Sequence, residues 1–440
     1  MNTPLSDVHQ DRNQATMKKV FSHLAIILGA ALLVIALALP IYVLPKGKVI
    51  PKDIESATVT KVTPGILTDA GALAADKPVA GKDSLPECRG ENKVVSCFIW
   101  PETDIQSQRF VMAQDPTDDD EVTLEAGGTV YQADLPEPEN LLSAEIDRVT
   151  LDRKTAFPVD EPTSSLNITA PGADGGNVQE DVPQFTRTGL QFQFPFNTEK
   201  KAYPFFDHRL METNDIDFVD QEKMDGETVY RFEQEIGPSE MYPNVEAMLK
   251  GDGELSAADR QSLGSLKLSF PAAKWGLTPD EVDGWDPEDD PAATNDEDSD
   301  EGADDAEGSD DAADADLGPE VEMSRYYTVN RVLRVQPDTG VIVHGAEEVW
   351  MFYARDDAEA EEMAKPENRE RELENPTRTA LYYPGEFNDE THDNQMARAK
   401  DGLKTMDLIG TYVPWGAGII GVILLIIGFL LSRAAGRHRN

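Results

Sequence analysis

The chain has 440 residues and a formal charge of −44 at pH 7, from 83 acidic residues against 39 lysines and arginines. Such a surface repels other anions, so nucleic acid, which proteins bind through a basic face, is excluded as a partner. An uncharged apolar run near each end points instead to a membrane protein with a large water-exposed part.

The first apolar run covers residues 21–44 and follows Lys18 and Lys19. At about 1.5 Å per residue a helix over this run reaches about 36 Å, enough to cross a hydrocarbon core of about 30 Å. The alternative is a signal peptide cleaved after Ala38. Because the run outlasts the usual signal-peptide core of about 7–15 residues, we predict a retained transmembrane helix, kinked or ended by Pro40, behind a cytoplasmic tail of residues 1–20.

The two cysteines of the chain, Cys88 and Cys97, lie in the stretch ECRGENKVVSCF. Residues 89–92 have turn chemistry and residues 93–100 have a strand pattern, so a hairpin would bring the thiols together. A disulfide here would contribute about 2.5–3 kcal/mol. Two free thiols or half a metal site are the alternatives, but no nearby histidine or third cysteine completes a zinc set. We predict the disulfide and no metal.

Residues 45–282 have mostly strand patterns. Apolar and polar residues alternate over 190–196 (LQFQFPF), as in a half-buried strand. Asp225-Gly226 separates two strand-like segments and predicts a short hairpin. A longer hairpin is predicted over 325–355, around the turn residues 337–340. Together these patterns predict a mainly antiparallel, β-rich (α+β) fold, continued in residues 317–387.

An acidic segment interrupts this region. Residues 283–316 contain 17 acidic residues and no lysine or arginine. Self-repulsion and the shortage of apolar groups leave nothing to offset chain entropy, so we predict a disordered insertion.

Helical patterns follow the second β-rich region. One helix is predicted over 358–374, and a juxtamembrane helix over 388–407 leads into a second transmembrane helix over 408–431. The basic tail of residues 432–440 contains no acid. Since basic residues favour the cytoplasmic side, we place both tails in the cytoplasm and residues 45–407 outside.

Two pairs of small residues suggest how the transmembrane helices meet. Ala25 and Gly29 in the first helix, and Ala417 and Gly421 in the second, have the small-xxx-small spacing that lets helix backbones approach closely. Chance is the alternative, since small residues are common in such helices. A substitution of Gly428, near the inner end, is expected to have little effect.

Motifs of known enzymes are missing: the sequence has no H-E-x-x-H pair, no G-x-S-x-G elbow, no Walker A loop and no G-x-G-x-x-G after a strand. Asp207 and His208 could meet His392 in the fold, but a lone exterior histidine is usually a hydrogen-bonding residue. We predict no catalytic residue and no cofactor.

Three stretches carry a resemblance to a known family: FPFNTEKKAYPFFD (194–207), DGETVYRF (225–232) and VLRVQPDTGVIVHGAEEV (332–349). They resemble the actinobacterial envelope proteins of the PorA porin family, which share the layout of two terminal spans around a long exterior region. The resemblance implies a channel in the envelope of an actinobacterium and supplies no catalytic residues.

The two apolar helices favour a different mechanism from the channel that the family resemblance implies. A porin crosses an outer membrane as a closed β-barrel, whereas two apolar helices indicate the cytoplasmic membrane and cannot alone enclose a pore. We therefore expect a non-enzymatic envelope transport protein, with a tethered lipid- or ligand-binding scaffold as the alternative and an envelope enzyme as the second. Its expected partners are membrane lipids, envelope lipids or ions as cargo, and other envelope proteins. An aromatic cluster would form either a lipid tunnel or ordinary core: Phe192, Phe194, Phe196, Tyr203, Phe205 and Phe206.

Overall fold

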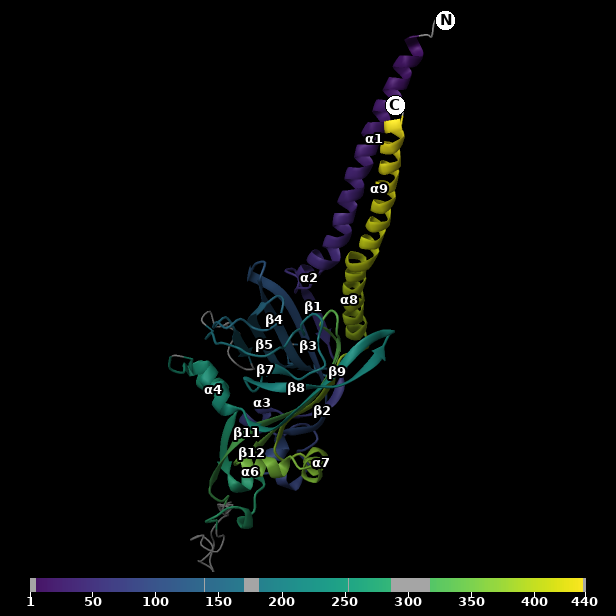
Figure 1. Cartoon of the computed structure of the whole chain (residues 1–440). Coiled ribbons are helices and arrows are strands. Elements are labelled where there is room, and N and C mark those ends of the chain that lie inside the picture. The colour runs from purple at the N-terminus through teal and green to yellow at the C-terminus, as the bar shows by residue number, and fades with distance from the viewer. Residues whose placement is uncertain (1–4, 138, 170–181, 252, 286–316, 438–440) are drawn as a thin grey trace, which may run out of the picture.

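The computed structural model describes residues 5–137, 139–169, 182–251, 253–285 and 317–437. They form a body built on one curled sheet, from which two long helices project (Figure 1). Apart from residues 283–285, the predicted acidic insertion lies outside the described residues.

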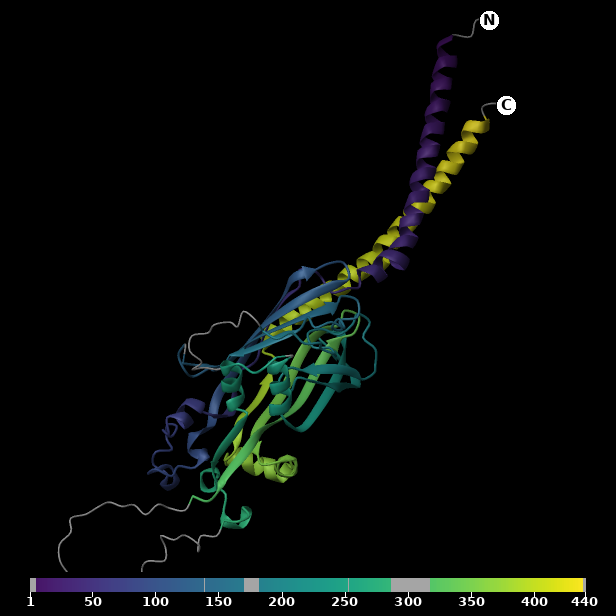
Figure 2. The same ribbon diagram turned by 90° about the vertical axis from the view of Figure 1, so that its left-hand side faces the viewer.

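The sheet body is antiparallel, and the described part of the chain contributes 13 strands to it. Their order is β6-β5-β4-β3-β2-β13-β12-β11-β9-β8-β7, with β1 paired to β3 and β10 paired to β11. Figure 2 shows the sheet curling into a half-barrel. The strands are β1 (Glu55–Val59), β2 (Thr63–Thr68), β3 (Ile99–Thr117), β4 (Glu121–Gln132), β5 (Leu141–Asp152), β6 (Ser165–Thr169), β7 (Tyr203–Asp207), β8 (Glu212–Met224), β9 (Glu227–Glu240), β10 (Lys267–Pro271), β11 (Glu320–Gln336), β12 (Val341–Ala354) and β13 (Thr379–Glu386).

Both predicted hairpins are confirmed. Asp225 and Gly226 connect β8 to β9, each with positive φ. The turn between β11 and β12 ends at Gly340, whose φ is +71°. A Cβ at Gly340 would lie 2.0 Å from the Phe194 carbonyl oxygen, so the turn requires glycine for both its conformation and its close approach.

The predicted strand over residues 190–196 is wrong. This stretch is irregular, and only Leu190 forms a β-bridge, with Phe205 of β7. Further along, the Phe194 amide donates to the Gly340 carbonyl at 2.9 Å. Phe185, a few residues earlier, bridges Ser164 at the other edge of the sheet. This seam segment (residues 185–196) therefore closes the gap between the two sheet edges, because its backbone bonds to β7 at one point and to remote loop residues at others, without pairing along a strand.

The predicted hairpin around the cysteines is also wrong in its second half. Residues Val95–Phe98 form a 3₁₀ turn, and the strand begins only at Ile99. Cys97 and Phe98 are both fully buried in this turn. The apolar residues here therefore reflect burial of the turn and not the alternating faces of a strand.

Short helices surround the sheet. The predicted helix over 358–374 is confirmed as two helices, α6 and α7, separated where Pro366 cannot continue the first. The predicted helix before the final apolar run is α8. The bounds are α3 (Ala70–Ala74), α4 (Tyr242–Lys250), α5 (Ala257–Gly264), α6 (Asp357–Met363), α7 (Pro366–Glu374) and α8 (Asp389–Asp407).

Two helices in the described part of the chain are long and apolar enough to cross a membrane. The first is α1 (Leu5–Ala38), which passes through a π-turn (Leu39–Val43) that contains Pro40 into α2 (Leu44–Gly47). At the other end, α8 continues through a π-turn (Leu408–Tyr412) into α9 (Val413–Arg437).

The predicted contact between α1 and α9 is confirmed: the two helices run side by side in Figures 1 and 2. A Cβ at Gly29 would lie 2.7 Å from the Gly421 carbonyl oxygen, so the backbones touch at this pair. The expectation that Gly428 has little role is wrong. Ser22 donates a hydrogen bond of 2.7 Å to its carbonyl, and a Cβ on Gly428 would lie 2.7 Å from the side chain of Ile26.

Candidate binding cavity

A cavity of about 160 Å³ lies inside the curl of the sheet. Alternate residues of β1 and β3 form one wall, and β11, β12 and β13 form another. The seam segment supplies residues 191–193, and α8 supplies Gln395 and Arg398. The cavity is therefore bounded by β1, which begins soon after α2, and by α8, which continues into α9.

A buried charged cluster forms part of the cavity wall. Asp207 is fully buried at the end of β7 and accepts hydrogen bonds from the Tyr327 hydroxyl at 2.9 Å and from Arg331 Nη2 at 2.8 Å. Arg331 also donates through Nε to Glu347 at 2.7 Å, its direct partner across β11 and β12. Gln234 accepts a further hydrogen bond from Arg331. The guanidinium thus joins two carboxylates inside the sheet body.

A second charged group includes Arg109 and His208, which also line the cavity. Glu145 of β5 is 3.2 Å from Arg109 Nη2 and 3.3 Å from His208 Nε2. Gly128 lies between Arg109 and Glu145 in the register of β3, β4 and β5. A Cβ at Gly128 would meet the Glu145 carboxylate at 2.9 Å, so glycine leaves room for this bridge.

The charged groups set one another's ionisation. Burial raises the pKa of Asp207, but Arg331 and His208 outweigh this effect and hold it well below its usual range. The pKa of Glu347 is lowered to about 2, because Arg331 and Arg209 overcome the effect of burial. For Glu145, burial is again outweighed, chiefly by His208 and Arg109, and its pKa is well below normal. All three carboxylates are therefore ionised at neutral pH.

The apolar part of the wall comes partly from the predicted aromatic cluster, which the fold divides. Phe194 and Tyr203 are core residues, packed with Phe232 at ring-centroid distances of 4.7 and 6.0 Å. Phe192, Phe205 and Phe206 line the cavity. The expectation of ordinary core therefore holds for Phe194, Tyr203 and Phe205, and the small cavity that three of the rings line is not a lipid tunnel.

Comparison with known proteins gives the family. The sequence model of the family "Porin PorA" matches residues 21–430. A protein named "Porin PorA" from Corynebacterium resistens is 51% identical over 428 residues, which cover 96% of this chain and all of that protein. Another of the same name, from Corynebacterium amycolatum, is 40% identical over 420 residues, 94% of this chain and 98% of its own. This chain belongs to the Porin PorA family.

Membership of the PorA family confirms the resemblance read from the three sequence stretches. It supports a porin-type protein in a cell-envelope membrane and points away from an enzyme. The matched range covers most of the apolar run in each long helix and the whole sheet body, so the residues that line the cavity lie within it.

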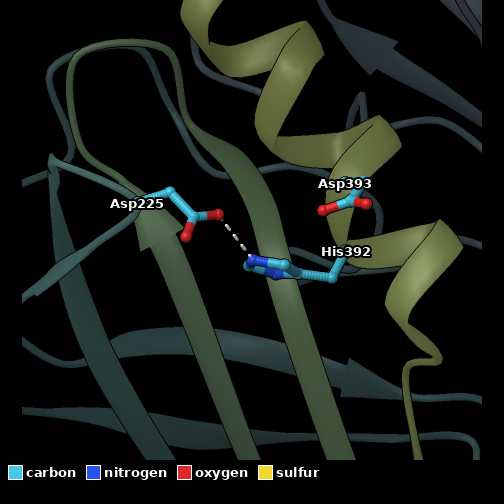
Figure 3. A group of neighbouring side chains, drawn as sticks. All are labelled: Asp225, His392 and Asp393. Atoms are coloured by element: carbon cyan, nitrogen blue, oxygen red, sulfur yellow. Dashed lines mark hydrogen bonds and ion pairs between the residues drawn. The ribbon is translucent and has the colours of Figure 1, made fainter.

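The combination of Asp207, His208 and His392 that the sequence suggested is not assembled as one site. Asp207 and His208 belong to the charged cluster, whereas His392 on α8 lies 2.9 Å from Asp225 in the β8–β9 turn (Figure 3). Its other ring nitrogen is 3.1 Å from the Val343 carbonyl. The pairing of His392 therefore ties α8 to the sheet.

Figure 3 also shows Asp393 beside this pair. Asp225, His392 and Asp393 each offer one ligand atom within 4.8 Å of the others, which is half of an octahedral set. The contacts of His392 with Asp225 and Val343 account for its ring without a metal.

Cys88 and Cys97 are close enough for the predicted disulfide: their Sγ atoms are 2.07 Å apart and their Cα atoms are 5.5 Å apart. The pair is disulfide-capable in the fold. Its oxidation stays a prediction for chemical labelling.

Sequence reasoning missed Arg331, Glu347 and Arg398 in the wall, and Glu145, which pairs with Arg109 of the wall. A signal for two of them existed: Arg331 sits between the buried Val329 and Leu333 on one strand face. Charged residues at inward positions of a strand are typical of a buried pair, and the pairing with Glu347 follows once the strand register is known.

Proposed function

We propose that this PorA-family protein is a membrane-anchored transport protein that binds the end group of its cargo in the cavity of the sheet body. Its two long helices cross the cytoplasmic membrane of an actinobacterium, with both termini in the cytoplasm and the acidic body outside. The apolar length of both helices and the basic C-terminal tail support this orientation. The helices serve as an anchor and not as the wall of a pore.

The close pairing of the helices supports the anchor role. Where Gly29 and Gly421 touch, the two backbones leave no lumen between them. Outward-facing residues such as Ile27, Ile419 and Phe429 are apolar and exposed in the isolated chain, as lipid-facing residues should be. A water-filled pore needs a polar lining.

The position of the cavity carries the proposal. Two elements of its wall, β1 and α8, are also the elements that lead from and into the apolar helices. A cargo that leaves the outer surface of the membrane would meet this wall first. A volume of about 160 Å³ is close to that of cavities that hold benzene and below the range for drug-sized ligands, so it accepts an end group and not a whole lipid.

A channel formed by several copies is the second candidate, and the family name of the relatives favours it. In that case, polar surfaces of neighbouring chains would have to line the conducting path.

One experiment separates the two candidates. The full chain is purified in lipid nanodiscs, and its bound lipids are identified by mass spectrometry. The same preparation is tested for conductance in planar bilayers. We expect a specific envelope lipid at about one per chain and no unitary conductance; conductance with no enriched lipid would reverse the choice.

A further inference from the structure

The cavity wall is rich in arginine although the chain is strongly acidic. Three of its arginines have carboxylate partners. Arg109 is 3.2 Å from Glu145, and Arg331 is 2.7 Å from Glu347. Arg209 is 3.7 Å from Glu347, but its buried Nη1 atom makes no hydrogen bond within the described residues.

Arg398 differs from these three. On α8 it donates one hydrogen bond of 3.3 Å to the neutral amide oxygen of Gln193, and among the described residues no carboxylate forms an ion pair with it. Burial lowers the pKa of Arg398, and no charged neighbour offsets that effect. Its guanidinium therefore pays a desolvation cost without a counter-charge.

The chain has 83 acidic residues against 39 lysines and arginines, and other cations of the body have an acid close by, as Arg109 with Glu145, Arg331 with Asp207 and Arg334 with Glu222. The side-chain amide of Gln193 is a neutral neighbour that accepts a hydrogen bond but leaves the positive charge uncompensated. The cavity thus retains a cation, and Arg209 Nη1 supplies a second free donor on the same wall.

We propose that Arg398 binds the anionic group of the cargo, a carboxylate or a phosphate, inside the cavity. The planar guanidinium offers paired donors that match both groups. Apolar residues of the same wall, including Phe192, Leu333 and Ile342, would contact a hydrocarbon chain attached to the anion. This inference rests on the proposed cargo-binding role of the cavity and specifies the chemistry of the cargo.

The test uses the full chain in nanodiscs and calorimetric titration with three probes: octanoate, 1-octanol and inorganic phosphate. Titrations into empty nanodiscs are subtracted. We expect octanoate to bind at one per chain and 1-octanol to bind at least about tenfold more weakly, because a charge-assisted hydrogen bond is lost. Binding of phosphate in competition with octanoate would identify a free anion as a sufficient ligand; octanoate binding without phosphate binding would identify the head of an amphiphile.

Variants then locate the contact. Arg398→Gln should weaken octanoate binding about tenfold or more and leave 1-octanol binding unchanged, while Arg398→Lys keeps the charge without the paired donors and should lose less affinity than Arg398→Gln. Lys400→Gln is the matched control, because it removes one charge from the same helix outside this cavity. Melting curves check that each variant is folded.

Each outcome has a distinct meaning. Equal binding of octanoate and 1-octanol to the unmodified chain would overturn the anion inference even if Arg398→Gln fails to fold. Normal octanoate binding by a folded Arg398→Gln variant would overturn it as well. Failure of all three probes to bind the unmodified chain would instead contradict the proposed function of the cavity.

Discussion

In the helix pair, the backbones touch where side chains are missing, at Gly29 and Gly421. In the interior of the sheet body, charged side chains make short contacts, as between Arg331 and Asp207 at 2.8 Å. The difference follows from the surroundings. Helices in lipid gain little from hiding apolar surface, so close backbone packing holds them together. A charge inside the sheet body is tolerable only with a partner, so pairing decides the interior there. The helix pair should therefore break when a side chain is added, and the sheet body when one is removed.

The largest effect is expected from Arg331→Met. The substitution removes the cation that the buried Asp207 and the half-buried Glu347 share. Its loss should lower the unfolding free energy by about 3–5 kcal/mol. Chemical denaturation of the chain in detergent measures the loss. Arg231→Met is the matched control: it removes an arginine that pairs with the exposed Asp220, where solvent screens the charges, and should cost far less. Equal costs for the two variants would show that burial of the pair is unimportant.

The predicted disulfide gives the next test. It concerns the sheet body alone, because the two long helices contain no cysteine. Replacing Cys88 and Cys97 with serine should lower the unfolding free energy by about 2.5–3 kcal/mol if the disulfide is formed. Thiol labelling of the native, unreduced chain should leave both residues unmodified. Labelling of both would refute the bond.

A somewhat smaller effect is expected from Gly421→Leu, which puts a side chain against the Gly29 carbonyl oxygen. Overpacking of this kind usually costs about 1–3 kcal/mol. A disulfide between cysteines introduced at Ala36 and Gly418 reports the pairing, because a Cβ at Gly418 would lie 3.7 Å from the Ala36 Cβ, within the range that a disulfide bridges.

The reporter bond should form within one chain in the unmodified background and be lost with Gly421→Leu. Gly416→Leu, at a glycine with open space around it, should leave it intact. Cross-linked dimers would place the contact between chains.

The last effect appears only in acid. Because the pKa of Glu347 is lowered to about 2 from an ordinary 4.5, its carboxylate stabilises the folded chain above pH 4.5. That contribution is lost as the pH falls through 4.5 towards 2. Melting temperature against pH should therefore fall less steeply over this window in Glu347→Gln than in the unmodified chain. Parallel curves would show that the pairing with Arg331 does not hold the carboxylate ionised.

The sequence predicted those parts of the fold that depend on residues close together in the chain. The Asp225-Gly226 turn and the Gly340 turn determine their hairpins within a few residues. Residues 190–196 look like a strand because their alternation is real, but their backbone partners are remote and give no sequence signal. Likewise the small-residue spacing predicted the Gly29 contact, whereas the role of Gly428 depends on the Ser22 hydroxyl of the other helix.

The candidate site was largely beyond prediction for the same reason. Asp207 and Arg331 are separated by 124 positions, and only the folded sheet brings them together. The significance of Arg398 is that no carboxylate among the described residues pairs with it, which no single sequence reveals. The aromatic rings of the site were identified as a cluster, but which of them face the cavity depends on the path of the seam segment.

Native mass spectrometry of cavity-filling variants tests the central claim most directly. Ser107 lines the cavity, whereas the next residue, Gln108, is exposed. If the cavity holds the end group of a cargo, the unmodified chain and Gln108→Trp will retain a bound ligand mass on release from nanodiscs, and Ser107→Trp will not. Retention of the same mass by a folded Ser107→Trp variant would contradict the account.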